Sequence, residues 1–572
     1  MKRLIFLGVV AVACSGATLA AATPATTIGA QKRYVVLYEA NASPAAARAA
    51  ITKAGGRILR ANARVGVATV VSANPYFRST AASSAAIKGV ARNTAIGTAP
   101  PPGRRFSEEM MRELRNATKG HARSGGDNGR RGGGGVEPLA PLQWDMKMIH
   151  ATADGSYAKE RGSRDVLVGI IDTGVDGNHP DIAANFSQSL SRNFTTDIPL
   201  IDGPCDAEPD HSCSDPANVD ENSHGTHVAS TIGSPINDLG MAGVAPKVTL
   251  VNLRAGQDSG YFFLQPSVDA LTYAGDHGID VVNMSYFIDP WLFNCRSNPG
   301  DSPAEQMEQR TIIEGTQRAL DYAHVHGVTL IAAAGNEHMN LAQVTSDESS
   351  PDFPPGAERT RTVDNNCLVM PGQGNNVIAV SSVGPTKAKA DYSNYGYHKV
   401  TVSAPGGYFR DAPWNLSMTP DQRNAAGIPN LILAAYPKNV AEEFGELEPD
   451  GTPNTPFVVR DCRGSTCAYY QWIQGTSMAT PHVVGVAALI ISKFGRRSRD
   501  GITLNPLLTQ AYLQGTATDT PCPTPNPFSY ADKGRPASYT AFCEGTPVYN
   551  GFYGHGIVDA LAAVGGNVSD DD

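Results

Sequence analysis

An unbroken apolar run leads directly into an acid and a glycine turn at Val166-Leu167-Val168-Gly169-Ile170-Ile171-Asp172-Thr173-Gly174. A run without polar alternation is typical of a strand that is buried on both faces of a sheet. Similar runs follow at 248–253, 279–284, 328–333 and 377–380, and helical patterns lie between them at 266–277 and 303–326. Strands that alternate with helices predict an α/β fold, a mostly parallel twisted sheet with helices on both faces.

Three glycine-punctuated segments carry groups that could work together in chemistry. They are Asp172-Thr173-Gly174, Asn222-Ser223-His224-Gly225-Thr226-His227 and Gly475-Thr476-Ser477-Met478-Ala479. A serine hydroxyl is a weak nucleophile until a neighbouring base removes its proton. An imidazole can take and return that proton near neutral pH, and a carboxylate orients the imidazole. Asp172, His224 and Ser477 are therefore candidates for nucleophilic acyl transfer.

Together these segments resemble the subtilisin-like serine peptidases, in which the chain order is Asp, His, Ser. Ala332-Ala333-Ala334-Gly335-Asn336-Glu337 is similar to that family's oxyanion segment. The resemblance extends over about 144–564 and implies a serine endopeptidase that works through an acyl-enzyme. It implies Asp172, His224 and Ser477 as the catalytic residues and Asn336 as the oxyanion donor, with a second donor in the N–H of Ser477.

The resemblance also implies a substrate-binding segment at Ser285-Tyr286-Phe287, together with Gly335 of the oxyanion segment. Many family members have Ser-Leu-Gly in place of residues 285–287, and this segment normally pairs with the substrate backbone. Two interpretations of Tyr286 and Phe287 stay open. They narrow the cleft or build an apolar subsite, or they pack under the insertion that begins at Pro290-Trp291.

One structural metal site is implied, and no cofactor is expected for the chemistry. In the family, an aspartate at the place of Asp181 ligates Ca²⁺ together with a loop after the histidine helix. Here the loop offers the Asn237 side chain and the carbonyls of Pro235, Leu239 and Met241, and oxygen-only ligation suits Ca²⁺. The family's further glutamine ligand has no counterpart at 139–141. His179, His227 and His482 are expected to be packed residues.

The first 22 residues have the anatomy of a secretory signal peptide. Lys2 and Arg3 precede the apolar run 4–13, and small residues follow at 17–22. We therefore predict a secreted, extracellular protein, with Cys14 in the discarded segment. The other eight cysteines are then expected to form disulfides, although eight cysteines allow 105 pairings. The near-neighbour hypothesis is Cys205–Cys213, Cys462–Cys467 and Cys522–Cys543, which leaves Cys295 with Cys367; a zinc site is disfavoured because no CxxC pair exists.

The chain divides into regions that differ in composition and in sequence pattern. Residues 31–99 show a β-α-β pattern and resemble the inhibitor-type prodomain of subtilisin-like zymogens, although an unrelated module would show the same pattern. Residues 100–142 are rich in Gly, Arg and Pro and read as a linker. The catalytic domain is expected at 143–566, with surface insertions at about 346–373 and 407–470, which lack the strand–helix rhythm.

Composition limits the partners. Lys+Arg total 46 and Asp+Glu total 55, a net charge of −9, which argues against nucleic-acid binding. After the signal, we identified no stretch apolar enough to cross a bilayer, so no membrane is expected in the mature form. We expect a monomer whose partners are protein or peptide substrates and its own prodomain. Two alternatives are a catalytically silent binding module and a lipase or esterase; the latter would need a G-x-S-x-G elbow and the order Ser, Asp, His.

Overall fold

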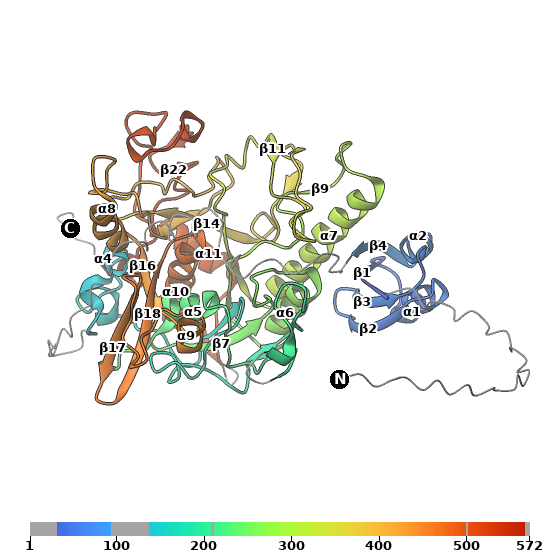
Figure 1. The fold of residues 1–572 in the computed structure, drawn as a ribbon, viewed down its shortest axis with the longest axis horizontal. Coiled ribbons are helices and arrows are strands. Elements are labelled where there is room, and N and C mark those ends of the chain that lie inside the picture. Colours follow the sequence, from blue (N-terminus) through green and yellow to red (C-terminus); the bar gives the residue numbers. More distant parts are fainter. Residues whose placement is uncertain (1–30, 93–136, 208–210, 499–500, 567–572) are drawn as a thin grey trace, which may run out of the picture.

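The computed structural model describes residues 31–92, 137–207, 211–498 and 501–566. The predicted signal peptide and most of the predicted linker lie outside these ranges. A small N-terminal sheet lies against a much larger body (Figure 1).

The large body is built on a seven-stranded sheet in the order β15-β14-β10-β8-β5-β7-β6, and every neighbouring pair is parallel. The strands are β5 Leu167–Ile171, β6 Arg192–Asn193, β7 Thr249–Arg254, β8 Val281–Met284, β10 Thr329–Ala333, β14 Val377–Val383 and β15 Val402–Pro405. The predicted parallel α/β fold is confirmed. Because parallel strands all end at one edge, the polar residues that follow β5, β8 and β10 come together there.

Helices cover both faces of this sheet. Helices α5 (His224–Gly233) and α10 (Thr476–Phe494) share one core with the side chains of Val168 and Ile170. Helices α6 (Leu264–Asp276) and α7 (Pro303–Val325) belong to a second core with Ile171, on the opposite face. This alternation follows from the two-residue period of a strand.

Helix α10 corrects one expectation. By length and composition this helix is apolar enough to cross a membrane, contrary to the expectation that no stretch after the signal has this property. Most of it is buried inside the molecule, where it packs against α5 and the central sheet. Its apolar surface is therefore satisfied by the protein core.

The segment 407–470 is not confined to the surface. It contributes β16 (Ile432–Ala435) and β17 (Val458–Arg463) to a three-stranded antiparallel sheet with β18 (Thr466–Ile473) between them. All four residues of β16 are buried in the main core. The expectation of a surface insertion is wrong here. A single short apolar strand that no helix follows does not show the alternation of strands and helices by which a buried segment is recognised in a sequence.

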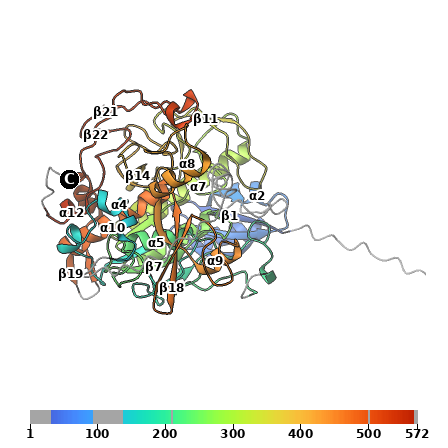
Figure 2. The same cartoon turned by 60° about the vertical axis from the view of Figure 1, so that its left-hand side comes forward.

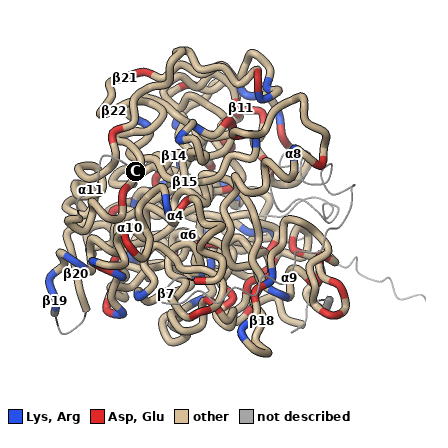
Figure 3. The backbone as a smooth tube through the Cα atoms, turned by 90° about the vertical axis from the view of Figure 1, so that its left-hand side faces the viewer, with Lys and Arg blue, Asp and Glu red and all other residues tan. Residues whose placement is uncertain are grey.

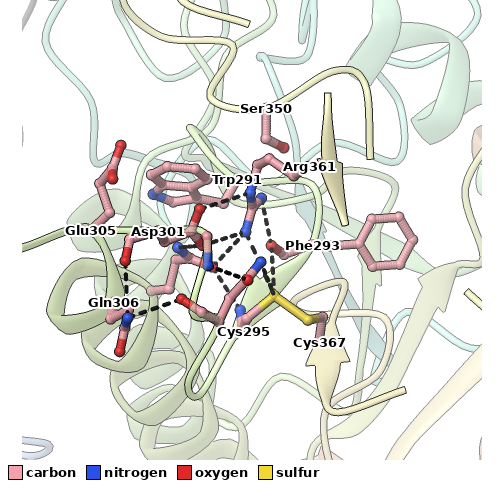
Figure 4. Close-up of polar contacts among 12 residues, drawn as sticks. Trp291, Phe293, Cys295, Asp301, Glu305, Gln306, Ser350, Arg361 and Cys367 are labelled. Atoms are coloured by element: carbon pink, nitrogen blue, oxygen red, sulfur yellow. Dashed lines mark hydrogen bonds and ion pairs between the residues drawn. A yellow bond between two sulfur atoms is a disulfide. The ribbon is translucent and has the colours of Figure 1, made fainter. Parts of the chain in front are cut away.

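The segment 346–373 is anchored in the interior by Arg361 (Figure 4). The buried guanidinium pairs with Asp301 and Asp347, each at 2.9 Å, and lies 4.5 Å from the ring of Trp291. The Cys295–Cys367 disulfide joins strands β9 (Asn294–Cys295) and β13 (Cys367–Leu368) beside it. Paired carboxylates offset the cost of burying the cation, so this insertion also has a fixed interior attachment.

Shorter elements complete the large body. They are η1 Ala140–Leu142, α4 Trp144–Met148, η2 Ser156–Ala158, η3 Cys205–Ala207, β9 Asn294–Cys295, β11 Ser346–Asp347, β12 Arg361–Thr362, β13 Cys367–Leu368, α8 Pro420–Gly427, η4 Ile428–Asn430, α9 Lys438–Glu443, β19 Arg496–Ser498, β20 Gly501–Thr503, α11 Pro506–Gly515, η5 Ala531–Lys533, η6 Ala537–Tyr539, β21 Gly545–Thr546, β22 Tyr549–Asn550 and α12 Ala560–Ala563. The structure contains the four expected disulfides, Cys205–Cys213, Cys295–Cys367, Cys462–Cys467 and Cys522–Cys543.

On the face of the molecule shown in Figure 3, acidic and basic residues are interspersed.

The N-terminal unit is a four-stranded antiparallel sheet in the order β2-β3-β1-β4. Its elements are β1 Lys32–Tyr38, α1 Pro44–Lys53, β2 Arg57–Asn62, β3 Val67–Ser72, α2 Phe77–Ala82 and β4 Ile87–Arg92. The sheet lies beside α6 and α7 (Figures 1 and 2). Tyr34, Ile51 and Phe77 are buried in a core of its own, so the unit has the internal packing of a small domain.

Residues 137–142 lie at the end of the predicted linker, yet they are folded onto the large body. The N–H of Leu139 donates to the carbonyl of Gly240 at 2.7 Å, and Glu137 is buried. The other domain boundaries remain predictions.

Candidate active site

Asp172 follows directly after β5 and is fully buried. Its Oδ1 lies 2.7 Å from Nδ1 of His224 and also accepts the N–H of Thr173 at 2.8 Å. The carboxylate therefore holds one ring nitrogen of His224 and leaves Nε2 as the other available base.

His224 is the first residue of α5, and two features place it against Asp172. A Cβ on Gly225 would lie 2.0 Å from the carbonyl oxygen of Gly174, so only glycine allows the two segments to approach this closely. The buried carboxylate of Asp220 accepts N–H groups from Asn222 and Thr226 around the start of the helix. Sequence reasoning missed Asp220, because it lies outside the recognised motif.

The environment of His224 adjusts its basicity. Burial disfavours the charged imidazolium and by itself would lower the pKa of His224. This effect is outweighed by the attraction of the Asp172 carboxylate, by the hydrogen bond between Asp172 and His224, and by the charge of Asp220. The pKa of His224 is therefore raised above 6.5. The ring is thus a stronger base than a free histidine.

Ser477 lies in the first turn of α10, which Gly475 precedes. Pro481 has no N–H to bond the Ser477 carbonyl, which instead accepts the hydroxyl of Ser285 at 3.0 Å. The Ser477 hydroxyl donates to the carbonyl of Ser285 at 3.3 Å. Within the described residues no hydrogen bond joins it to His224; such contacts are often long before substrate binds.

The side chain of Asn336 is oriented by Thr476. Its Oδ1 accepts both the N–H and the Oγ1 hydroxyl of Thr476, each at 2.9 Å. The amide Nδ2 is therefore left to donate elsewhere. Residues 335 and 336, after β10, line the same cleft as His224 and Ser477.

The cleft has a volume of about 610 Å³ and contains all the predicted substrate-binding residues, Ser285, Tyr286, Phe287 and Gly335. The ring of Tyr286 stacks on Phe262 with centroids 4.1 Å apart, and its side chain is mostly buried. Phe287 packs against the apolar cluster that includes Leu292. Both rings line the cleft, and Phe287 also packs against residues that follow Pro290-Trp291; their role in substrate binding stays a prediction.

The three remaining motif histidines are buried, as expected. Burial lowers the pKa of His227 to about 3 and that of His179 to about 4, so both are neutral. The Nε2 of His227 lies 3.1 Å from the carbonyl of Gln471, and His482 pairs with Asp145 at 3.0 Å. These rings serve packing.

The loop predicted to hold calcium lies beside Asp181. Asp181 is fully buried; its Oδ1 accepts Nδ2 of Asn237 at 3.1 Å, and its Oδ2 accepts the N–H of Met241 and the hydroxyl of Tyr470. Sequence reasoning missed Glu137, whose carboxylate accepts N–H groups of the same loop, including that of Asn237 at 2.8 Å.

These residues fit a hard cation. Burial raises the pKa of Asp181 well above its ordinary value, and the nearby Glu137 adds repulsion. In the described part of the chain, neither carboxylate has an ion-pair partner, and no hydrogen bond reaches the carbonyls of Pro235, Leu239 or Met241. The Asp181 carboxylate and these carbonyls are oxygen donors of the kind that Ca²⁺ prefers, whereas Oδ1 of Asn237 already accepts the N–H of Leu239 at 2.9 Å and would have to exchange that bond for the ion.

A second acidic cluster does not need a metal. Oxygens of Asp197, Asp215 and Asp258 lie within 4.8 Å of one another. The guanidinium of Arg254 is buried among them and pairs with all three, at 2.8 Å to Asp258 and 3.3 Å to Asp197. The protein itself thus supplies the cation.

Comparison with known proteins agrees with this geometry. The model of the subtilase family matches residues 163–534. The chain is 26% identical to subtilisin DY from Bacillus licheniformis over 64% of this chain and 89% of that protein. It is 27% identical to thermitase from Thermoactinomyces vulgaris, over 70% and 92%. The epidermin leader peptide processing serine protease from Staphylococcus aureus shares the fold, with a TM-score of 0.60 and 21% identity over 94% of this chain and all of that one. The chain belongs to the subtilase family and is a subtilisin-like serine endopeptidase.

Proposed function

We propose that this chain is a secreted endopeptidase, made as a zymogen, that cleaves peptide bonds through Asp172, His224 and Ser477. The observation that carries the proposal is the convergence of the Asp172–His224 pair, the Ser477 hydroxyl and the Asn336 amide on one 610 Å³ cleft. Four disulfides support an oxidising compartment and hence export.

The geometry supports the following reaction. Nε2 of His224 takes the proton of Ser477 as Oγ attacks the substrate carbonyl, because Nδ1 is occupied by Asp172. The negative oxygen that forms accepts hydrogen bonds from Asn336 Nδ2 and the Ser477 N–H at the start of α10. The imidazolium then gives its proton to the leaving amine, and water hydrolyses the acyl-enzyme by the same steps.

A fluorophosphonate probe tests this assignment directly. Such a probe phosphonylates only an activated serine, so mass spectrometry of the matured protein should find one modification, on Ser477. The Ser477→Ala variant is the control and should stay unlabelled. A matured, folded protein that takes no label would contradict the proposed function.

The N-terminal unit supports the zymogen proposal through its contacts with α6 and α7. Asp269 of α6, mostly buried, pairs with Arg60 at 2.6 Å and accepts Nδ2 of Asn62 at 2.8 Å. Buried Glu308 of α7 pairs with Arg92 at 3.3 Å and accepts its N–H at 2.8 Å. Positive residues of the N-terminal unit thus meet negative helix residues, and these pairs would hold the unit on the large body after the linker is cut.

We expect Asp269→Asn combined with Glu308→Gln to release the prodomain at least tenfold faster once the linker is cut. Removing one partner of a buried charge pair mainly raises the dissociation rate. The measurement is the lag before full activity after limited cleavage. The exposed pair Arg64–Asp276 provides the control, because Asp276→Asn should change the lag less than threefold. Equal lags in all variants would exclude these contacts from inhibition.

The pH profile should follow His224. Only the neutral imidazole accepts a proton, so kcat/KM should fall about tenfold per pH unit below its pKa and level off above it. Because the pKa of His224 is raised, the midpoint should lie above pH 6.5. The measurement is kcat/KM for an uncharged peptide between pH 5 and 9. An optimum below about pH 5 is incompatible with this base.

Calcium should stabilise the fold without taking part in the chemistry. We propose that Asp181, Asn237 and the loop carbonyls hold the ion, which at about 100 times its Kd would contribute ~2.7 kcal/mol. Chelation should therefore lower Tm by several degrees and speed thermal inactivation, while initial rates in the cold stay unchanged. Asp181→Asn should remove the response to calcium. An identical Tm with and without the ion would exclude the site.

A further inference from the structure

The turn that carries Asn336 has an irregular backbone. Residues 334–339 leave β10, and within them Gly335 has a φ of +102° and His338 a φ of +58°. A left-handed conformation at a residue such as His338 is uncommon and persists only where surrounding contacts determine it. The position of Asn336 therefore depends on what holds this turn.

A second asparagine, fully buried, makes those contacts. Oδ1 of Asn394 accepts the N–H groups of Glu337 at 3.2 Å and Met339 at 2.7 Å. Its Nδ2 donates to the carbonyl of Ala334 at 3.0 Å and to Oε2 of Glu337 at 2.6 Å. Its own N–H donates to the carbonyl of Gly335 at 2.9 Å. Both side-chain polar atoms of Asn394 are thus bonded to this turn, on either side of Asn336.

The fit leaves no room for another arrangement. A Cβ on Gly335 would lie 2.4 Å from Nδ2 of Asn394, so the amide packs directly under the glycine. Asn394 has no exposed surface and cannot exchange these bonds for water. Loss of either donor or acceptor would leave buried backbone groups unpaired.

Asn394 is itself tied to the core by Lys389. The buried Nζ donates to the carbonyl of Ser393 at 2.8 Å and lies 5.0 Å from the ring centre of Tyr395 and 5.4 Å from that of Tyr530. The buried Nζ, held by the carbonyls of Ala390 and Ser393, fixes the backbone one residue before Asn394. The contacts that hold the turn therefore extend from Asn394 through Ser393 to the buried side chain of Lys389.

We propose that Asn394 is a positioning residue for the reaction, which sets the place of Asn336 Nδ2 relative to Ser477. The inference rests on the proposed oxyanion role of Asn336. Donors act only if they match the oxyanion closely, and a shift of about 1 Å costs about a hundredfold in rate. Because the oxyanion exists only in the transition state, a displaced turn lowers kcat and leaves KM nearly unchanged.

Asn394→Asp is the sharpest test, because it keeps the shape and both accepted bonds but turns the donor into an acceptor facing Glu337. We expect kcat to fall about 10–100-fold and KM to change less than threefold. The matched control is Asn550→Asp. Asn550 is also buried, accepts two N–H groups and donates to the carbonyls of Thr520 and Thr546, and it does not line the cleft. This control should have a lower Tm than wild type, and its kcat should stay within twofold of the wild-type value.

A double-mutant cycle separates positioning from general stability. In an Asn336→Leu background the donor is gone, so Asn394→Asp should cost less than threefold more in kcat. Equal losses in both backgrounds, or the same loss in the Asn550 control, would overturn the inference while leaving the proposed function intact. If Asn336→Leu alone leaves kcat unchanged, the oxyanion assignment fails and this inference fails with it.

A rescue variant covers the case in which Asn394→Asp folds poorly. Adding Glu337→Gln supplies an amide that can donate back to the new carboxylate, and titration with fluorophosphonate counts the folded active sites. We expect the double variant to regain at least tenfold in kcat per active site over Asn394→Asp. If Asn394→Asp does not fold, the double variant should retain at least a tenth of wild-type kcat per site. A well-folded double variant would count against a positioning role if it does not regain tenfold in kcat over Asn394→Asp. Where Asn394→Asp does not fold, a double variant below a tenth of wild-type kcat per site would do the same.

Discussion

Ser477→Ala should abolish peptidase activity and leave the chain folded at its unprocessed size. We expect kcat to fall by about a millionfold, the loss known for the nucleophile of subtilisin itself. The variant removes only the hydroxyl, whose one hydrogen bond to the described residues is a 3.3 Å contact with the carbonyl of Ser285, so we expect the packing of α10 to be unchanged. Self-cleavage of the linker should stop as well, because it would use the same serine.

The measurement is the mass of the protein secreted by a host that lacks other proteases, followed by a peptidase assay. Wild type should reach mature size under these conditions and the variant should not. Thermal unfolding of both full-length chains serves as the folding control. If the variant is processed like wild type, another protease matures this chain.

Asn336→Leu should lower kcat by about 10²–10³-fold with little change in KM. Loss of one such donor costs about 3–4 kcal/mol in the barrier, as known for the corresponding asparagine of subtilisin. Leucine matches the size of asparagine, so substrate access is preserved. Because Oδ1 also accepts the N–H and hydroxyl of Thr476, part of the loss reflects those unpaired donors.

Asn336→Asp keeps the acceptor for Thr476 and replaces the donor with a negatively charged acceptor, so its loss of kcat owes nothing to unpaired Thr476 donors. Steady-state kinetics of both variants, normalised by active-site titration, give the comparison. We expect both to lose at least a hundredfold in kcat. A loss below threefold in either variant would show that Asn336 does not face the oxyanion.

The local features of this chain were readable from its sequence. The run 166–171 predicted a buried parallel strand because a strand covered on both faces needs no polar alternation. The candidate residues Asp172, His224 and Ser477 were recognisable because each lies in a short glycine-bearing turn whose pattern spans few residues. The Cys462–Cys467 and Cys205–Cys213 pairs followed because short loops are the easiest to close.

Tertiary structure decided which distant polar groups meet. Thr476 orients Asn336 from 140 positions away, and Glu337 meets Asn394 from 57 positions away. No periodic pattern encodes such contacts. The same holds for Arg361, which would read as a surface charge but is buried against Asp301 across 60 residues. A sequence pattern reflects interactions between residues that are close along the chain. The partner of a buried polar group depends instead on how strands and helices pack. The chemistry of the cleft was therefore predictable in its reacting groups, and only the fold shows what holds them in place.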